Sequence, residues 1–332
     1  MRATPWIGAA AMVLSEMVFG FGGKGVPGHV RPVVHEPPSH PYVVDPPTDR
    51  KGIEVNGPWD DRIRDHIARE GIRALVLNSA KGWSGTDYGF LRELDQIEEL
   101  KILASAGTNV AALEEMRALE RLSLTVVTRE TVDFTRLANL RQAYVHWWPG
   151  ARSIVEARGL RSLYLDRVKL PSFSALCGLE ALESLTLANA SIASIADIEC
   201  LSGLTRLELL NCRKLADFAG LERFTRLRRL VISGSKALRE IDFVSGMREL
   251  EMLDISDNGA VATLAPLAKA TSLRALAMAG GTNVEDGDLS VLTGLPRLAM
   301  LMFAPRRHYT HKLVKPWNWN NFEVPATLLE AK

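Results

Sequence analysis

The hydrophobic and polar positions of this chain follow one short pattern that recurs eleven times between Ile72 and Arg306. Each copy has an apolar residue, two others, a second apolar residue, one other and a third apolar residue, as in Leu182, Leu185 and Leu187. The copies begin at 72, 97, 119, 140, 160, 182, 204, 227, 250, 273 and 298, so the intervals run from 20 to 25 residues. A fixed period of this length indicates a solenoid of short stacked repeats.

Each copy predicts a short β-strand followed by a tight helical turn. Leu185 and Leu187 are two positions apart, so an extended chain places both on one face and Thr186 on the other. The apolar residues that follow recur at the three-residue spacing of a 3₁₀ turn; they are Ile192, Ile195, Ile198 and Leu201. The predicted fold is therefore an α/β solenoid of about eleven repeats. A curved parallel sheet would line its concave face, and short helical or 3₁₀ turns its convex face.

The alternative is a solenoid of paired amphipathic helices, because leucines at intervals of three and four also fit a helix. Such repeats have longer periods of about 33 to 47 residues. A two-residue leucine interval that recurs once per repeat does not fit a single helix face, so the strand interpretation is favoured.

Two units read LESLTLANASIASIADIECLSGL and LEMLDISDNGAVATLAPLAKATSL. They resemble bacterial leucine-rich repeats of the short, internalin-like class, over about residues 72–306. The resemblance implies a surface that binds a partner and seldom carries out chemistry. The segments GWSGTDYGFLREL (82–94) and PRRHYTHK (305–312) also resemble an uncharacterised group of bacterial leucine-rich-repeat proteins, which implies no activity.

Repeats of this class carry Asn or Cys five residues after the second strand leucine, where the side chain bonds backbone groups of the turn. This chain has such a residue only at Cys212 and Asn258. The same slot is otherwise filled by Ala80, Ser105, Val127, Trp148, Val168, Ala190, Ser235, Gly281 and Arg306. The sequence therefore does not predict a ladder of side-chain bonds over most of the array.

The termini differ in composition from the array. Residues 1–58 contain nine of the sixteen prolines, and we expect an apolar N-terminus and a mobile, Pro-rich leader that forms no ladder. Residues 59–71 predict a capping helix with Trp59, Ile63 and Ile67 on one face. The array then spans 72–306, and 307–332 form a C-terminal cap and tail.

The prediction of the cellular compartment depends on the first 22 residues. The apolar run Trp6–Leu14 follows Arg2 and resembles a weak secretory signal, but Glu16 and the lack of an Ala-x-Ala site oppose export. A cytoplasmic protein is favoured, with export as the alternative. The run is too short for a membrane span. The cysteines are odd in number and lie within repeats, which predicts buried thiols rather than a disulfide framework; they are Cys177, Cys200 and Cys212.

Charge and motifs exclude several functions. The 40 basic and 39 acidic residues are interspersed and give a net charge of +1, so no basic stripe indicates nucleic-acid binding. No phosphate loop, nucleophile elbow or zinc motif is present. His308 and His311 have no Cys or carboxylate close by in sequence, so we expect them to cap the array rather than bind a metal. We expect no cofactor.

The outward strand positions form columns on the concave face. The central column reads Val76, Lys101, Ser123, Tyr144, Tyr164, Thr186, Glu208, Val231, Asp254, Ala277 and Met302, and its two neighbours begin at Ala74 and Asn78. The predicted partner-binding site lies where aromatic and charged residues meet on adjacent strands: Tyr144, His146, Trp147, Tyr164, Asp166 and Arg167. Tyr, Trp and Arg are enriched in binding hot spots.

Two aromatic residues beside this cluster allow a structural interpretation. The repeat that contains HWWPGA is the shortest, at 20 residues, and Ala143 replaces its strand leucine. Trp148 occupies the inward slot and is expected to fill the resulting gap. For Trp147, filling the gap and binding a partner are equally favoured.

A second candidate patch is apolar and lies on the last strands: Met252, Ala275, Ala277, Met300 and Met302. Methionine surfaces adapt to varied partners. The aromatic residues of the tail, Trp317, Trp319 and Phe322, could instead fold back and cover this patch, and that covering role is slightly favoured.

The sequence as a whole favours a non-enzymatic, monomeric scaffold that binds another protein, with an inhibitor or immunity role suggested by analogy. The alternative is a secreted or surface-attached adhesion module. A remote alternative is a hydrolase that uses His146 and Asp166.

Overall fold

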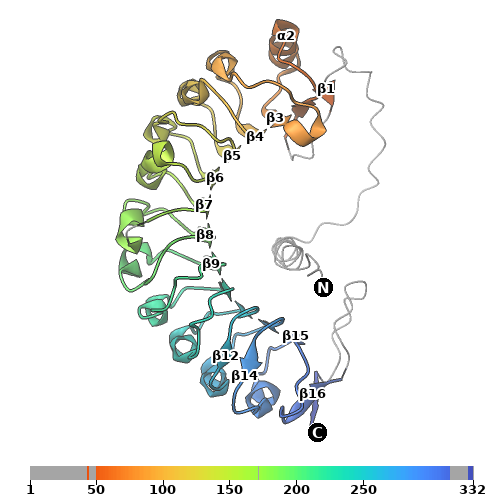
Figure 1. Cartoon of the computed structure of the whole chain (residues 1–332), viewed down its shortest axis with the longest axis vertical. Coiled ribbons are helices and arrows are strands. Elements are labelled where there is room, and N and C mark those ends of the chain that lie inside the picture. Colours follow the sequence, from red (N-terminus) through yellow and green to blue (C-terminus); the bar gives the residue numbers. More distant parts are fainter. Residues whose placement is uncertain (1–42, 45–49, 171, 315–327, 332) are drawn as a thin grey trace. The chain divides into compact units, whose positions relative to one another are not determined.

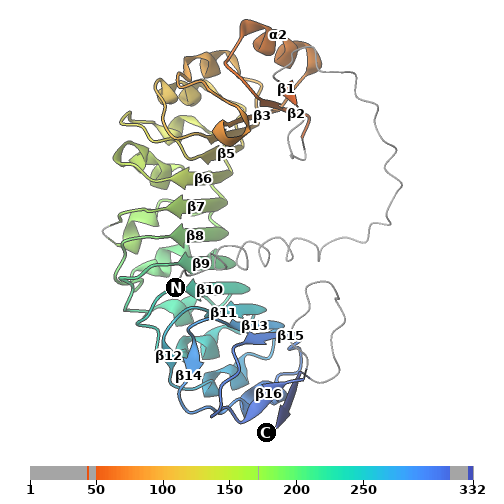
Figure 2. The ribbon, with the colours of Figure 1, turned by 45° about the vertical axis from the view of Figure 1, so that its right-hand side comes forward.

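One long sheet collects the strands of the repeats in chain order. The computed structural model describes residues 43–44, 50–170, 172–314 and 328–331, all within the unit Ser39–Lys332. The thirteen-stranded sheet has the order β1-β2-β3-β4-β5-β6-β7-β8-β9-β10-β11-β13-β15, in which only the β1–β2 pair is antiparallel. Figure 1 shows the strands on the inner side of the array, and Figure 2 shows them side by side.

The eleven predicted strands are all present. Their bounds are β3 (Ala74–Asn78), β4 (Glu99–Leu103), β5 (Arg121–Leu124), β6 (Gln142–His146), β7 (Ser162–Asp166), β8 (Ser184–Ala188), β9 (Arg206–Leu210), β10 (Arg229–Ser233), β11 (Met252–Asp254), β13 (Ala275–Met278) and β15 (Met300–Phe303). Parallel β12 (Ala260–Val261) and β14 (Asn283–Val284) form a separate small sheet, as do antiparallel β16 (His311–Leu313) and β17 (Leu329–Ala331). The α/β solenoid prediction is confirmed.

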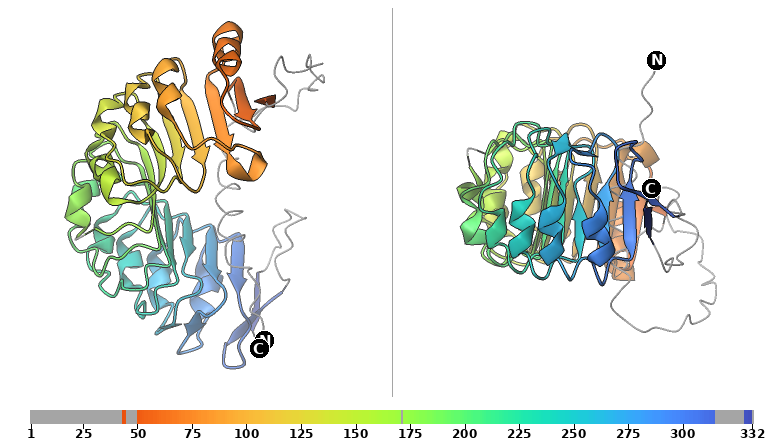
Figure 3. Two further views of the ribbon diagram at one scale, coloured as in Figure 1. Left: turned by 45° about the horizontal axis from the view of Figure 1, so that its top comes forward. Right: turned by 90° about the horizontal axis from the view of Figure 1, so that it is seen from below.

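Short 3₁₀ turns follow the strands, and most of them lie on the outer side of the array (Figure 3). They are η2 (Ser79–Lys81), η3 (Gly89–Glu93), η4 (Val110–Glu115), η5 (Phe134–Arg136), η6 (Pro149–Glu156), η7 (Phe173–Leu176), η8 (Ile198–Leu201), η9 (Leu221–Arg223), η10 (Asp242–Gly246), η11 (Ala265–Lys269) and η12 (Ser290–Gly294). No helix in the described part of the chain is long and apolar enough to cross a membrane.

The core lies between the strands and these turns. Leu182, Leu185 and Leu187 are at most 1% exposed, and the corresponding apolar residues of the other repeats are also buried, except that Leu298 of the last repeat is only partly buried. Each fully buried leucine contributes about 1.5 to 3 kcal/mol to folding. Because each repeat packs mainly on its neighbours, these contributions add along the array.

The N-terminal end begins earlier than the sequence predicted. The helix expected over 59–71 is α2 (Asp61–Glu70), which starts at the cap Asp60 and stops at Gly71, a residue with φ of 62°. Before it, β2 (Gly52–Val55) extends the sheet parallel to β3, and β1 (Val43–Val44) pairs with β2. The predictions that 1–58 form a mobile leader, and that its Pro-rich part forms no ladder, are therefore wrong for these segments. The strand Gly52–Val55 lacks the leucine pattern that identified the others.

At the C-terminal end, Tyr309 is buried against the last repeat. Its ring meets Phe303 edge-on at a centroid distance of 5.7 Å, and its hydroxyl accepts a bond from the Val284 amide. A ring nitrogen of His308 lies 2.8 Å from the Val284 carbonyl oxygen, as expected of a capping residue. Trp317, Trp319 and Phe322 lie outside the described residues.

A disulfide joins Cys177 and Cys200, which follow one another at a separation of 23 residues in adjacent repeats. The prediction of three buried thiols is therefore wrong for this pair. It is confirmed for Cys212, which is free and buried. A separation close to one repeat length places two side chains at nearly equivalent positions of neighbouring turns, and that is the signal the sequence offered for the pairing.

Candidate functional site

Two stacked tyrosines stand at the centre of the concave face. The strand register pairs Tyr144 of β6 with Tyr164 of β7, and both side chains point away from the core. Neighbouring strands lie about 4.8 Å apart, which is the distance at which two rings can stack. The ring centroids are 4.3 Å apart and the planes differ by 20°. The sequence columns therefore placed this pair correctly.

Both tyrosine hydroxyls stay neutral at physiological pH. Burial is the main cause that raises the pKa of each, and the nearby Asp166 carboxylate adds to it. The rings are half-buried, so each offers an apolar face together with a hydroxyl that can donate or accept.

Asp166 anchors the adjacent polar group. Its carboxylate lies 3.2 Å from Nδ1 of His146 on the neighbouring strand, and it accepts a 2.7 Å bond from Nδ2 of Asn189. The Nε of Arg167 is 3.7 Å from the same carboxylate, but the Arg167 side chain is largely exposed at the strand end. Asp166 thus holds the predicted residues His146 and Arg167 close to the tyrosine pair.

The two tryptophans divide between core and surface. Trp148 is buried, meets Phe134 edge-on and donates from Nε1 to the Glu130 carbonyl at 2.7 Å, so its predicted inward position is confirmed. Gly150 makes this close approach possible, because a Cβ there would lie 1.9 Å from the same oxygen. Trp147 is partly buried against the core and partly exposed, so its side chain packs on the core and also leaves surface that a partner can contact.

A recess of about 310 Å³ opens beside the tyrosine pair, over β4 to β7. Its polar lining includes Glu99, Lys101 and Arg121 as well as the two tyrosines. Nζ of Lys101 lies 2.8 Å, and Nη1 of Arg121 3.3 Å, from the Glu99 carboxylate. The sequence columns contained these charged residues, but the predicted site did not include them. The signal was present, since Lys101 and Tyr144 occupy the same column two strands apart.

The second candidate patch is smaller than its sequence suggested. Its residues share the expected register across β11, β13 and β15. Met252 and Ala277 are only 6% and 5% exposed, and Nη1 of Arg229 lies 2.9 Å from the Met252 sulfur. Ala275, Met300 and Met302 keep intermediate exposure.

The histidine of the site is paired with a carboxylate, because Nδ1 of His146 lies beside Asp166. No group of three or more His, Cys, Asp or Glu is placed to hold a metal ion in the described part of the chain.

These elements define a leucine-rich-repeat solenoid, and solved structures agree. No protein-family model and no curated protein matches the chain. An internalin (InlF) from Listeria monocytogenes matches with a TM-score of 0.50 and 20% sequence identity, over 71% of this chain and 77% of that one. The chain in the TLR13–ssRNA13 complex matches with a TM-score of 0.53 and 18% identity, over 74% of this chain but only 37% of that one. The resemblance to internalin-like repeats is confirmed for the fold.

Proposed function

We propose that this chain is a non-enzymatic scaffold that binds another protein on its concave face. The observation that carries the proposal is the half-buried, stacked pair Tyr144 and Tyr164 beside an open recess. Aromatic residues with a polar handle, held rigid before binding, are the residue type that dominates interface energies. His146, Trp147, Asp166 and Arg167 extend the same surface.

The matched structures support the fold. One of these structures is a complex with single-stranded RNA, so a protein and an RNA are the two kinds of partner to compare. In this chain the carboxylates near Tyr164 are those of Asp166 and Glu208, which form ion pairs with Arg167 and Arg229, so a phosphate chain crossing the tyrosine pair would compete with these carboxylates for the cations. This distribution favours a protein partner.

The test is capture of the partner from the native organism, followed by affinity measurement with variants. The double variant Tyr144→Ala/Tyr164→Ala should weaken binding by at least about 30-fold, because hot-spot truncations cost about 2 kcal/mol or more. A matched control is Met300→Ala/Met302→Ala, which removes two outward side chains from the other candidate patch. Urea unfolding must show that both variants remain folded.

Unchanged affinity in the tyrosine variant would remove this site from consideration. Loss in the methionine variant alone would transfer the binding role to the second patch.

The alternative of an exported adhesion module has a specific observation in its favour. The Cys177–Cys200 disulfide is of a kind that persists in oxidising compartments and is rare in the cytosol. Export would therefore replace the cytoplasmic location favoured by the sequence. Alkylation of native cells before lysis, followed by mass spectrometry of both cysteines and of the N-terminus, distinguishes the two. Free thiols and an uncleaved N-terminus in the cytosolic fraction would exclude export.

A further inference from the structure

The recess beside the tyrosines has two unlike walls. Glu99 and Lys101 of β4 and Arg121 of β5 form a charged wall, while Tyr144 and Tyr164 form an aromatic wall. The remaining lining residues are uncharged. A ligand that fills the recess must therefore satisfy charge at one end and an aromatic surface at the other.

The charged wall carries an excess of positive charge. Glu99 is 4% exposed and lies beneath the two cations, whose side chains are 30% and 32% exposed. The lining thus has two positive charges and one negative charge. Because the buried carboxylate fixes both cations at 2.8 and 3.3 Å, they are oriented before a ligand arrives.

The dimensions limit what can enter. A volume of about 310 Å³ accommodates one or two side chains rather than a folded element. A carboxylate is the group that Arg and Lys recognise in protein partners, through charge-assisted hydrogen bonds. An aromatic side chain can stack on the exposed tyrosine face.

The strand spacing sets the distance between these two features. Lys101 and Tyr144 lie on strands two apart, which corresponds to about 10 Å. An extended segment rises about 3.3 Å per residue, so this distance spans two to three residues.

We propose that the recess binds an acidic side chain of an extended segment of the partner protein, with an aromatic side chain two or three residues away on the tyrosine pair. The inference rests on the proposed function and specifies the chemistry of the partner. Single-stranded RNA would offer phosphates and bases to the same walls, but it would also extend past Asp166 and Glu208. A single carboxylate side chain can enter the recess without passing these two residues.

The experiment is selection of a displayed library of random dodecapeptides on the full chain. Peptides that bind should be enriched in Asp or Glu two or three positions from Phe, Tyr or Trp. The variant Lys101→Gln/Arg121→Gln should weaken binding of the best peptide by at least about tenfold, because it removes the charge-assisted hydrogen bonds to the peptide carboxylate. The control Arg226→Gln/Lys269→Gln removes the same charge from exposed positions outside the recess and should bind as the wild type does.

Each other outcome counts against the inference. No enriched peptide, enriched peptides without acidic residues, or equal binding to Lys101→Gln/Arg121→Gln would overturn it. The inference would also be overturned if a twelve-nucleotide oligouridylate bound in a way that depended on Lys101 and Arg121 while no peptide did. Peptides that depend on the two tyrosines but not on the cations would overturn the inference and leave the proposed function standing. Peptides that depend on neither pair would contradict both.

Discussion

Two regions of the array hold their repeats together in different ways. In the C-terminal region, from β9 to β13, buried side chains bond the backbone of successive repeats. We call this set the buried ladder; it consists of Cys212, Ser235, Asn258 and Thr282, each at most 1% exposed. In the N-terminal region, from β4 to β7, the equivalent polar bonds come from the outer loops.

Asn258 is the centre of the buried ladder. Its Oδ1 accepts from the Ser235 amide at 2.8 Å, and its Nδ2 donates to the carbonyls of Ile232 and Ile255 at 2.7 and 2.8 Å. The Thr282 hydroxyl bonds the same Ile255 carbonyl at 2.6 Å and accepts from the Asn258 amide at 3.1 Å. Ser and Thr thus continue a ladder that the sequence predicted only from Asn and Cys.

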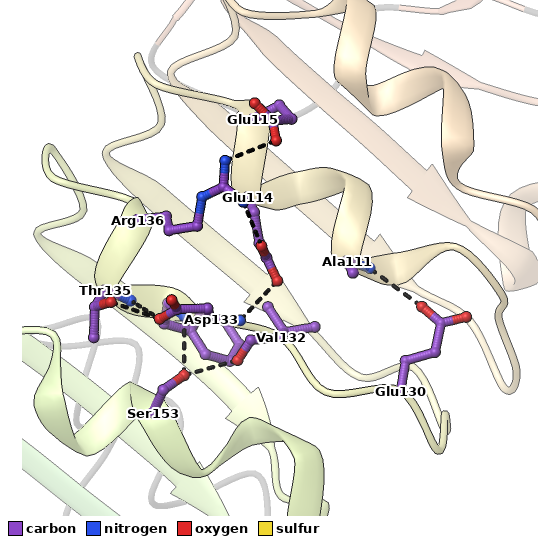
Figure 4. Close-up of polar contacts among 10 residues, drawn as sticks. Ala111, Glu114, Glu115, Glu130, Val132, Asp133, Thr135, Arg136 and Ser153 are labelled. Carbon is purple, nitrogen blue, oxygen red and sulfur yellow. Dashed lines mark hydrogen bonds and ion pairs between the residues drawn. The ribbon is translucent and has the colours of Figure 1, made fainter.

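The N-terminal region replaces this ladder with a second set, shown in Figure 4, which we call the outer-loop contacts. Glu130 accepts from the Ala111 amide at 3.3 Å, and Glu114 accepts from the Asp133 amide at 2.8 Å. Ser153 accepts from the Phe134 amide at 2.9 Å and donates to the Val132 carbonyl at 2.7 Å. These bonds are only partly buried, so each contributes less than one in the buried ladder.

The comparison shows that the strand register does not depend on which polar side chains bond the turns. The register across β4 to β7 continues without a shift, as it does across β9 to β13. The position of the tyrosine pair therefore follows from the strand pairing and the apolar core. The side chains that bond the turns can change without moving it.

The largest expected effect is on the buried ladder. Asn258→Ala would remove the side-chain partner of the buried Ser235 amide and of the Ile232 carbonyl, at about 1 to 3 kcal/mol for each group, while the Ile255 carbonyl would keep its bond from the Thr282 hydroxyl. We expect the free energy of unfolding to fall by about 4 kcal/mol, measured by urea denaturation. Glu130→Ala is the matched change in the outer-loop contacts, and it should cost about 1 kcal/mol. Equal losses would contradict the distinction between the two regions.

The next effect concerns the junction of the two regions, where the disulfide lies between the β7–β8 and β8–β9 loops. A cross-link that closes a loop of 23 residues stabilises by about 3 kcal/mol, mainly by restricting the unfolded chain. Cys177→Ser/Cys200→Ser should lower the free energy of unfolding by that amount without changing the affinity of the tyrosine site. A variant with wild-type stability, or thiols that react in the native protein, would show that the bond does not form in solution.

A smaller effect is expected at Trp148. Trp148→Phe keeps an aromatic ring in the same buried position beside Phe134 but removes the bond to the Glu130 carbonyl. The expected loss of stability is about 1 to 2 kcal/mol, from the lost bond and the smaller ring. Trp147→Phe is the control, because that side chain is only partly buried and should cost less. A larger loss at Trp147 would mean that the two residues have exchanged roles.

The sequence predicted the repetitive parts of the molecule and missed its exceptions. The central column was correct from Val76 to Met302, because a period of two fixes which side chains face outward. The slot assignment failed at Val127, which is 62% exposed while Val126 is buried.

Part of the candidate site was predictable for the same reason. Tyr144 and Tyr164 come together through register alone, and His146 meets Asp166 in the same way. The recess was not predicted, because a column gives the position of a Cα and not the reach of a long side chain. Lys101 and Arg121 both bend toward Glu99, and that convergence is a property of packing.

The smallest expected effect is the pH dependence of stability that Cys212, the first residue of the buried ladder, produces. Burial raises the pKa of the Cys212 thiol to about 11 from an ordinary value of 9.0. The unfolded chain therefore ionises first, so this contribution to stability is complete below about pH 9 and declines as the pH rises toward 11. Between pH 8 and 9.5 the wild type should lose about 1 kcal/mol or less relative to Cys212→Ala, measured from urea midpoints at each pH. If both proteins show the same pH dependence, the thiol is accessible in solution and the ladder begins at Ser235, one repeat further from the candidate site.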